Sequence, residues 1–405
     1  MHAHDLVLKA GIVFCGSPPQ LTKVDIAFRD GKISAITENI PAEASREVKL
    51  LDGQYVLPGL IDMHTHVYWG GTPLGVNPDK LGPLSGVTTW VDMGSAGAGN
   101  FEGLYHHIIK KSKVRILSFL HLSYLGLVSV GDTKLRFGEL FDSRLADATA
   151  VAQTVEKYRD NIKGLKLRIG MESALTEGQA YLDIALGLGE RLGLPIVVHA
   201  TSAPPTTAEV LRKLRKGDIF THCFATSATT GIVDRKMCVL PEAIEARDRG
   251  VLFDVGYGAR SFSSQAAAAA LGQGFRPDFI SSDLHAYSLG TTMTGLPSAL
   301  SKFVHLGMPI DAVFRAVTSA PAEYLGIGDE AGYLKEGMPA DVTILKWSKD
   351  EVDHLDGEGR SFRGKILESE GTYRNGIKLE PFDDGREEAK WKPGLVLPVP
   401  RREPK

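Results

Sequence analysis

The stretch PGLIDMHTH, residues 58–66, joins a run of apolar residues to two histidines that are one residue apart. In an extended strand, side chains at positions i and i+2 project to the same face, so His64 and His66 can bind one metal ion. A His-x-His pair by itself is a weak sign, because short pairs arise by chance. If this strand end is a metal site, the rest of the chain has to supply further ligands.

Apolar, strand-like runs of this kind recur along the middle of the chain, with helix-forming stretches between them. The eight runs are residues 55–63, 86–94, 114–122, 162–170, 194–200, 218–224, 250–256 and 278–283. Eight strand–helix units within residues 58–331 have the size of a (β/α)8 TIM barrel, and we predict this α/β fold. An open, doubly wound sheet is the alternative. Neither a phosphate-binding loop nor a dinucleotide-binding glycine fingerprint follows the first strand.

Both ends of the chain have the pattern of short β-strands. Branched apolar residues nearly alternate there, and the Asp-Gly and Asn-Gly pairs at 30–31, 52–53 and 375–376 indicate hairpin turns, because glycine accepts the positive φ that such turns require. We predict that residues 1–57 and 332–405 form one small composite β-sandwich domain. Roughly the last 20 residues are rich in proline and charge, and we expect them to form a surface tail.

Polar residues end several of the predicted barrel strands. His199 ends the fifth run, His222 lies at the end of the sixth and Asp283 ends the eighth. Taken singly, a strand-end histidine is more often structural, and an aspartate more often caps a helix. In a barrel, however, the carboxyl ends of all strands meet at one mouth, which would bring these side chains to His64 and His66. Imidazole and carboxylate ligands suit zinc, although iron or manganese would also fit.

A lysine lies on the fourth predicted strand. Alternation along residues 162–169 places Lys166 on the face that points into the barrel, while leucines occupy the other face. An unpaired buried ammonium is costly, so the amine has to be neutral, paired with a buried carboxylate, or modified. Reaction with CO2 would give a carbamate, an anion whose two oxygens can bridge two cations. Beside the surrounding histidines we favour the carbamate.

These motifs resemble the amidohydrolase superfamily of metal-dependent hydrolases. The resemblance extends over nearly the whole chain, from PGLIDMHTH to TSAPAEYLGI (318–327) and GMPADVTIL (337–345). Within the superfamily, residues 86–104 and 164–170 resemble the deacetylase branch, which is also described as dihydroorotase-like. The resemblance implies a (β/α)8 barrel, a β-sandwich built from both chain ends, and two divalent metal ions, expected to be Zn²⁺.

The resemblance also implies how the ligands are shared. The implied first site consists of His64, His66 and Asp283, and the second of His199 and His222. Carboxylated Lys166 bridges the two sites. Two cations would lower the pKa of a shared water, so that a bridging hydroxide attacks the substrate carbonyl. Asp283 is then the catalytic residue that accepts the proton and passes it to the leaving group.

Residues that bind the substrate are harder to identify. Arg168 lies two positions after Lys166 on the same face, where its guanidinium could grip a substrate carboxylate or pair with an anionic ligand. Further candidates follow strand ends, and for each a packing or capping role is the alternative: Tyr68, Trp69, Ser95, His121, Tyr257 and His285. Tyr257 stands where the deacetylase branch would have a histidine, which leaves the exact substrate open.

We therefore predict a metal-dependent hydrolase that removes an acyl group from a small carboxylate-bearing molecule, either an N-acyl amino acid or an O-acyl 2-hydroxy acid. A cyclic amidohydrolase of the dihydroorotase or hydantoinase type would use the same ligands. A non-enzymatic scaffold on the same fold would need no stoichiometric metal. A mononuclear deaminase would give Lys166 no role.

Composition supports a protein that acts on small molecules. With 46 Lys and Arg against 49 Asp and Glu, the formal net charge of −3 favours neither nucleic acid nor anionic lipid as a partner. We expect no membrane span and no signal peptide. Three cysteines cannot all pair within one chain, which favours a reducing, cytoplasmic location. The oligomeric state stays open, a homo-oligomer included.

Overall fold

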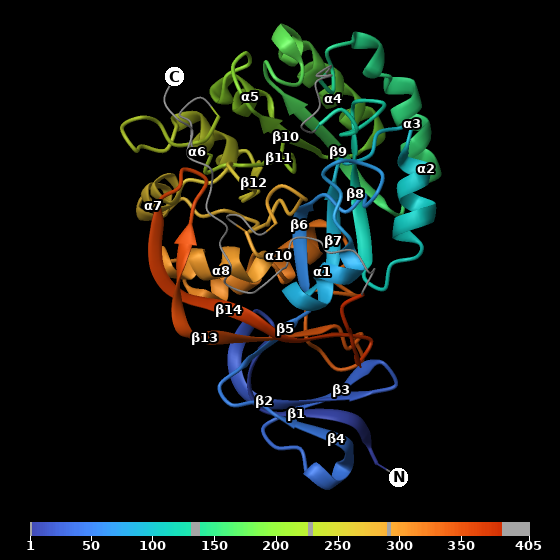
Figure 1. Cartoon of the computed structure of the whole chain (residues 1–405), viewed down its shortest axis with the longest axis vertical. Coiled ribbons are helices and arrows are strands. Elements are labelled where there is room, and N and C mark those ends of the chain that lie inside the picture. The colour runs from blue at the N-terminus through green and yellow to red at the C-terminus, as the bar shows by residue number, and fades with distance from the viewer. Residues whose placement is uncertain (1, 131–137, 226–229, 290–292, 383–405) are drawn as a thin grey trace.

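The computed structural model describes residues 2–130, 138–225, 230–289 and 293–382. It has two parts, a barrel of parallel strands and a smaller β domain that is built from both ends of the chain (Figure 1). The predicted fold class, a (β/α)8 barrel with a small β-sandwich domain, is confirmed. The predicted C-terminal tail lies outside the described residues.

In the part of the chain that the structure describes, seven parallel strands form the wall of the barrel, and each is hydrogen-bonded to the next in chain order. They are β6 (Leu60–Thr65), β7 (Val87–Met93), β8 (Arg115–His121), β9 (Ile162–Ile169), β10 (Ile196–Ala200), β11 (Ile219–Phe220) and β12 (Leu252–Phe253). Their sequences are nearly continuous apolar runs, because helices cover the outer face and packed side chains fill the interior.

The eighth predicted strand, residues 278–283, forms isolated bridges and backbone hydrogen bonds to its neighbours. The amides of Val255 and Tyr257 each donate at 3.1 Å, to the carbonyls of Phe279 and Ser281 respectively. Phe279 bridges Asp254, just after β12, and Leu284 bridges Thr65, the last residue of β6. Both bridges are parallel, so this segment closes the ring between the last strand of the barrel and the first.

Side-chain hydrogen bonds hold this closing segment in place. The Ser281 hydroxyl donates to Asp254 at 2.6 Å, while the amide and hydroxyl of Ser282 donate to Asp62 at 3.0 and 2.5 Å. Asp62 lies on β6 and Asp254 directly follows β12. These two buried carboxylates, on β6 and directly after β12, therefore add to the backbone hydrogen bonds that fix the segment in the ring.

Helices alternate with the barrel strands and cover the outside of the barrel (Figure 1). They are α1 (Pro78–Ser85), α2 (Phe101–Leu104), α3 (Ala148–Lys157), α4 (Gly178–Leu192), α5 (Thr207–Lys213), α6 (Pro241–Asp248), α7 (Ser264–Gly272), α8 (Leu296–His305), α9 (Ile310–Arg315) and α10 (Ser319–Tyr324). A π-helical turn, Tyr105–Ile109, extends α2, and three short 3-10 turns are Ala42–Ala44, Ser143–Leu145 and Leu175–Glu177. The longest helix, α4, ends at Gly193, whose φ of 62° is the left-handed conformation that stops a helix.

The smaller domain is one mixed sheet of eight strands from both chain ends. They are β1 (His4–Gly16), β2 (Pro19–Arg29), β3 (Lys32–Thr37), β4 (Ser45–Leu50), β5 (Tyr55–Pro58), β13 (Val342–Leu355), β14 (Ser361–Arg374) and β15 (Ile377–Lys378). Strand β5 joins the two ends, because it pairs in parallel with β1 and antiparallel with β13. In Figure 1 the layer of β13 and β14 lies between the barrel and β1–β4. Apolar side chains from both layers form the core between them.

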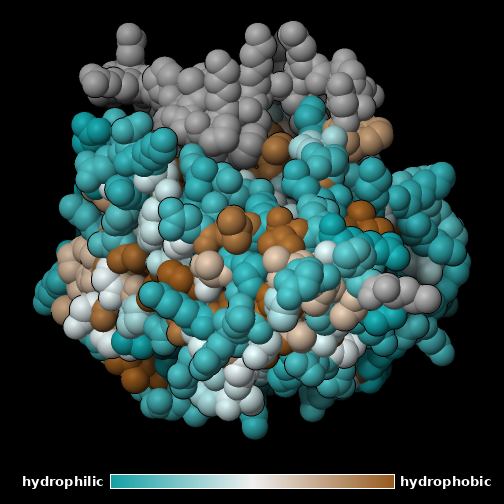
Figure 2. Space-filling view, turned by 90° about the horizontal axis from the view of Figure 1, so that it is seen from below, coloured by the Kyte–Doolittle hydropathy of each residue, from teal (hydrophilic) through white to brown (hydrophobic). Residues whose placement is uncertain are grey.

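The outer face of this domain shows no single large apolar patch in Figure 2, where hydrophobic side chains are interspersed among hydrophilic ones. Among the described residues, none of the helices combines the length and apolar character that a membrane crossing requires.

Candidate active site

A cavity of about 480 Å³ opens at the carboxyl ends of the barrel strands. All the side chains that the sequence predicts as metal ligands line it, namely His64, His66, Lys166, His199, His222 and Asp283. These residues come from five different segments of the barrel, so the fold brings together side chains that are up to 219 positions apart along the chain (64 to 283).

The carboxylate of Asp283 lies between the two histidines of the first strand. Its Oδ1 atom is 3.2 Å from His66 Nε2 and 3.5 Å from His64 Nε2. One ligand atom from each of His64, His222 and Asp283 lies within 4.8 Å of the others, which is a spacing that one metal ion can bridge. The donor set of imidazole nitrogens and a carboxylate oxygen therefore fits a divalent transition metal.

The two later histidines lie side by side, with ring centroids of His199 and His222 only 3.8 Å apart. Nδ1 of His222 donates to the Gly256 carbonyl at 2.6 Å, since a carbonyl can only accept. This bond fixes the tautomer and leaves Nε2 of His222 as the atom with a free lone pair. Burial, chiefly, lowers the pKa of His199 well below its usual range, so its imidazole is neutral and able to bind a metal.

Lys166 is buried, with 3% of its surface exposed, and its Nζ atom has no hydrogen-bond partner among the described residues. Burial lowers the pKa of this amine to about 7, and the nearby carboxylates of Asp283 and Asp254 only partly oppose that effect. A buried amine without an acceptor is destabilising unless another group completes its surroundings. A carbamate on Lys166 would remove this unpaired amine, because its oxygens would bridge cations held by the surrounding ligands.

Buried aspartates orient the candidate ligands through hydrogen bonds on the side away from the cavity. Nδ1 of His64 donates to the Thr221 hydroxyl at 2.9 Å, and this hydroxyl donates to Asp254 at 2.6 Å. The chain of bonds directs Nε2 of His64 toward the cavity. Burial raises the pKa of Asp254 to about 6.

The second histidine of the pair is held in the same way. Nδ1 of His66 lies 2.9 Å from the Ser95 hydroxyl, and the backbone amide of Ser95 donates to Asp92 at 2.8 Å. Asp92 also accepts from the Val67 amide at 2.9 Å. Ser95, predicted as a substrate residue, therefore contacts a candidate metal ligand and does not line the cavity.

The charge state of Asp283 suits a metal ligand. Burial alone would raise the pKa of this carboxyl, but the hydrogen bond from His66 and the neighbouring His285 and His222 outweigh burial and lower it to about 2. Its second oxygen, Oδ2, faces His285, whose Nε2 is 4.0 Å away. The two oxygens of Asp283 thus have different surroundings, one beside the paired histidines and one toward the cavity.

The predicted carboxylate-binding arginine is already paired. Arg168 lines the cavity, but its guanidinium donates to Glu139 at 2.6 Å, and Glu139 is almost completely buried. A second arginine, Arg260, lines the same cavity, is exposed, and has no hydrogen bond or ion pair to another described residue. Of the two, Arg260 is the guanidinium that is available to an anionic ligand.

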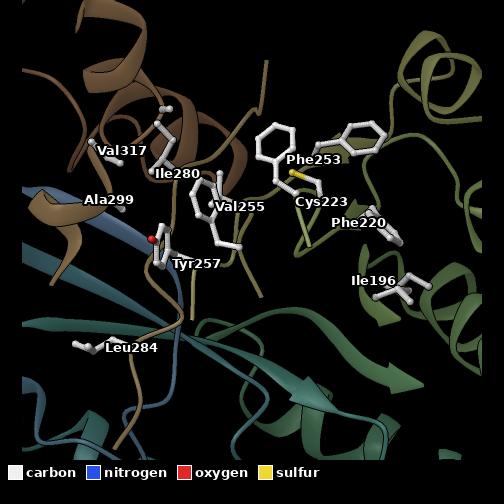
Figure 3. Close-up of a cluster of buried hydrophobic side chains, with 14 of the residues drawn as sticks. Ile196, Phe220, Cys223, Phe253, Val255, Tyr257, Ile280, Leu284, Ala299 and Val317 are labelled. Carbon is white, nitrogen blue, oxygen red and sulfur yellow. The ribbon is translucent and has the colours of Figure 1, made fainter. Parts of the chain in front are cut away.

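Besides Ser95, two predicted substrate residues lie away from the cavity. Tyr257 is completely buried: its hydroxyl donates to the Leu355 carbonyl at 2.6 Å and accepts from Lys302 at 2.8 Å. Figure 3 shows its ring packed within the apolar cluster of the barrel. Alternation along the strand end is the reason, because Gly256 and Gly258 face the ligands and Tyr257 points the other way. Trp69 is partly buried and is not among the cavity-lining residues, whereas His285 is.

Sequence reasoning missed several functional candidates that the structure shows. They are Asp62, Asp92, Asp254, Glu139, Arg260 and Tyr287. The three aspartates had a signal, since each interrupts an apolar strand run (LIDM, WVDM, LFDV), and a carboxylate in such a run must be hydrogen-bonded. Arg260 had no such signal in the sequence, because only the folded path of the loop after β12 brings its side chain to the cavity.

Comparison with known proteins identifies the family. A model of the amidohydrolase family matches residues 55–363. The chain belongs to the amidohydrolase family. A deacetylase of Agrobacterium fabrum is 33% identical over 339 residues, covering 84% of this chain and 82% of that protein. A deacetylase of Enterococcus faecalis is 31% identical over 366 residues, covering 88% and 93% respectively. The predicted resemblance is confirmed, and the amidohydrolase is a hydrolytic enzyme and not a bare scaffold.

Solved structures agree with this assignment. The amidohydrolase superposes on an adenine deaminase with a TM-score of 0.83 and on a dihydroorotase with a TM-score of 0.82. Each is 29% identical in sequence, and each match covers 93% of this chain and 99% of the other. The members of one fold thus include proteins named for different reactions, so the substrate has to be argued from the cavity.

Proposed function

We propose that this amidohydrolase removes an acyl group from a small carboxylate-bearing molecule at a site for two divalent cations. The observation that carries the proposal is the buried Nζ of Lys166, which has no hydrogen-bond partner among the described residues and lies in a cavity that four histidines and Asp283 also line. His64, His66 and Asp283 would hold one ion, and His199 and His222 the other. A carbamate on Lys166 would bridge the two. Zinc is the ion that this donor set fits best.

When bound, the ions would polarise the acyl carbonyl and lower the pKa of a water molecule. The chain itself supplies the proton transfer. Oδ1 of Asp283 lies with the first pair of histidines, while Oδ2 is free to take a proton and release it to the leaving group. His285 lies next to this oxygen and lines the cavity, so it contacts the leaving group or the acyl oxygen.

The lining of the cavity supports a substrate with one acidic and one apolar part. Arg260 offers a guanidinium that has no partner among the described residues and can bind a carboxylate through two parallel hydrogen bonds. Leu74, Leu127, Val130 and Tyr287 supply apolar surface. N-acyl amino acids and O-acyl 2-hydroxy acids have this combination, and the names of the Agrobacterium fabrum and Enterococcus faecalis deacetylases agree with acyl removal.

The first experiment measures metal content and hydrolysis together. Purified enzyme is assayed against a panel of acylated amino acids and acylated hydroxy acids, with metal determined by elemental analysis. We expect two ions per chain in the wild type and loss of both metal and hydrolysis in Lys166→Ala. Lys163→Ala is the matched control, because Lys163 lies on the opposite face of β9 and is partly exposed. Two retained ions and full activity in Lys166→Ala would refute the bridge.

The second experiment tests the carboxylate contact. Arg260→Met should raise KM for acidic substrates about 10- to 100-fold, the range of a lost charge-assisted hydrogen bond, with a much smaller effect on their methyl esters. Arg168→Met serves as the comparison, because Arg168 is held by Glu139. An equal loss on acids and esters in Arg260→Met would argue against carboxylate binding. A selective loss in Arg168→Met alone would move the contact to that residue.

A second candidate function is opening of a cyclic amide. The similarity to a dihydroorotase over 93% of this chain favours it. A cyclic-amide hydrolase and a deacylase share the metal ligands, so the substrate panel should include dihydroorotate- and hydantoin-like rings. Ring opening at a higher kcat/KM than any deacylation would replace the proposed function.

A further inference from the structure

One more polar atom near the proposed bridge is unpaired. His121, the last residue of β8, is completely buried, and its Nδ1 accepts a hydrogen bond from the Ser123 amide at 2.9 Å. A nitrogen that accepts from an N–H carries no hydrogen of its own, so this imidazole is neutral and its hydrogen is on Nε2. Among the described residues that Nε2–H has no acceptor. A buried donor without an acceptor is rare and calls for a ligand or a water molecule.

The neighbour of His121 across the sheet is Lys166. The two residues are register partners on the parallel strands β8 and β9, so their side chains project to the same face of the sheet. Both flank Gly94, where an added Cβ would lie 2.6 Å from Lys166 Cβ and 3.3 Å from His121 Cδ2. The cavity lining includes Lys166 but not His121, so His121 approaches the lysine from the side rather than from the substrate space.

We propose that Nε2–H of His121 donates a hydrogen bond to a carbamate oxygen on Lys166 and thereby positions and stabilises the modified lysine. This inference rests on the carbamate of the proposed function. In the modification step the neutral amine of Lys166 forms an N–C bond to CO2. One carbon–oxygen π pair becomes a lone pair on oxygen, and one N–H proton leaves to solvent. The product is an anion whose two oxygens keep lone pairs beyond those that the cations would use, and His121 supplies a donor to one of them.

The residue is well placed for this role because its hydrogen position is fixed before the carbamate forms. The backbone amide of Ser123 cannot reverse the direction of its bond, so the imidazole presents a donor at all times. His121 is therefore a positioning residue that acts through Lys166 and does not touch the substrate.

The test compares two side chains of nearly equal size at position 121. Gln can donate from its amide nitrogen, whereas Met has a similar length and no donor. The zinc-loaded His121→Gln and His121→Met enzymes are equilibrated with ¹³C-bicarbonate, and the carbamate signal is recorded by ¹³C NMR over a series of bicarbonate concentrations. His107→Phe, on an exposed helical turn, controls for the loss of a histidine.

We expect the wild type, His107→Phe and His121→Gln to give the carbamate signal at similar bicarbonate concentrations, and His121→Met to require about tenfold more, as for loss of a hydrogen bond to a charged group. An unchanged titration in His121→Met overturns the inference and indicates that water satisfies Nε2, while the proposed function stands. No carbamate signal in the wild type overturns both.

Should neither variant fold, the wild type itself provides the measurement. In protein labelled with ¹⁵N-histidine, removal of CO2 should shift the His121 Nε2 resonance and leave the tautomer unchanged. A resonance that does not respond contradicts the inference.

Discussion

Two of the candidate ligands have an unusual backbone. The φ angles of His222 and Asp283 are 58° and 46°, in the left-handed region that residues with a Cβ rarely adopt. Such a conformation costs about 1–3 kcal/mol and persists only where the surroundings enforce it. Gly258, with a φ of 58°, allows the close approach, since a Cβ there would lie 2.5 Å from Asp283 Oδ2. This backbone conformation goes with the position of both ligands, just after β11 and at the end of the closing segment, where their side chains line the cavity.

At the level of single residues, the structure makes a prediction for Asp254. Its carboxylate accepts from Thr221, which in turn orients His64. Asp254→Asn weakens this chain, because an amide is a poorer acceptor and offers a donor in its place. We expect metal affinity to fall about 10- to 100-fold, measured by competition with a chelator.

Asp341→Asn is the control for that experiment, because Asp341 is also a buried aspartate but accepts from Asn375 in the β domain. Equal metal affinities of Asp254→Asn and the wild type would show that the hydrogen bonds from Asp254 through Thr221 do not orient His64.

Among the elements, helix α8 connects the barrel to the hairpin of β13 and β14. Lys302 on α8 is buried, donates to the Tyr257 hydroxyl at 2.8 Å and lies 4.1 Å from the centroid of that ring. The Tyr257 hydroxyl donates onward to Leu355 at the end of β13. The same tyrosine lies between two glycines that pack on His222 and Asp283, so this contact links the loop beside these two candidate ligands to the hairpin.

This contact predicts a pH dependence of stability. Burial lowers the pKa of Lys302 to about 7, against 10.5 for the free side chain. Between these values the unfolded chain binds a proton that the folded chain does not, so the free energy of unfolding should rise with pH. The slope of a single group is at most about 1.4 kcal/mol per pH unit. Below pH 7 both states are protonated and this contribution is constant.

The measurement is the free energy of unfolding by denaturant for the wild type and Lys302→Met at several pH values between 7 and 10. The difference between the two should change with pH, the wild type gaining relative to the variant as pH rises. Parallel curves would mean that Lys302 keeps its charge in the folded state.

At the scale of the whole molecule, the two domains share their cores. Phe314 on α9 of the barrel contacts Phe14 on β1 and Tyr55 on β5, with ring centroids 5.9 and 5.4 Å apart. Strands from both ends of the chain contact the barrel, since β2 packs on α9 and β14 packs on β7. Helices α1 and α8 also pack on β14. The barrel and the β domain are therefore expected to unfold together.

Phe314→Ala tests that expectation. Loss of a buried phenylalanine from a core should cost about 3–5 kcal/mol, and the whole molecule should lose this stability in one transition. Calorimetry combined with far-UV circular dichroism would measure it. Two separate transitions, with only the β domain destabilised, would show that the domains fold independently.

Much of the fold and of the candidate site could be predicted from local patterns. Strand alternation placed Lys166 toward the interior, and the order of strand ends named the six candidate ligands that line one cavity. The eighth predicted strand closes the ring through isolated bridges and backbone hydrogen bonds. Its serines also bond to Asp62 and Asp254 through their side chains, contacts that the apolar pattern of the segment does not predict.

The sequence by itself determined which side chains point into the barrel, because the period of a strand depends only on the local backbone. Only the tertiary structure decided what each of them meets there. The guanidinium of Arg168 donates to Glu139, Arg260 has no partner in the described part of the chain, and the hydroxyl of Tyr257 donates to Leu355. The physical reason is that ion pairs and hydrogen bonds between different strands and loops depend on the packed positions of whole elements, and no single stretch of sequence encodes those positions.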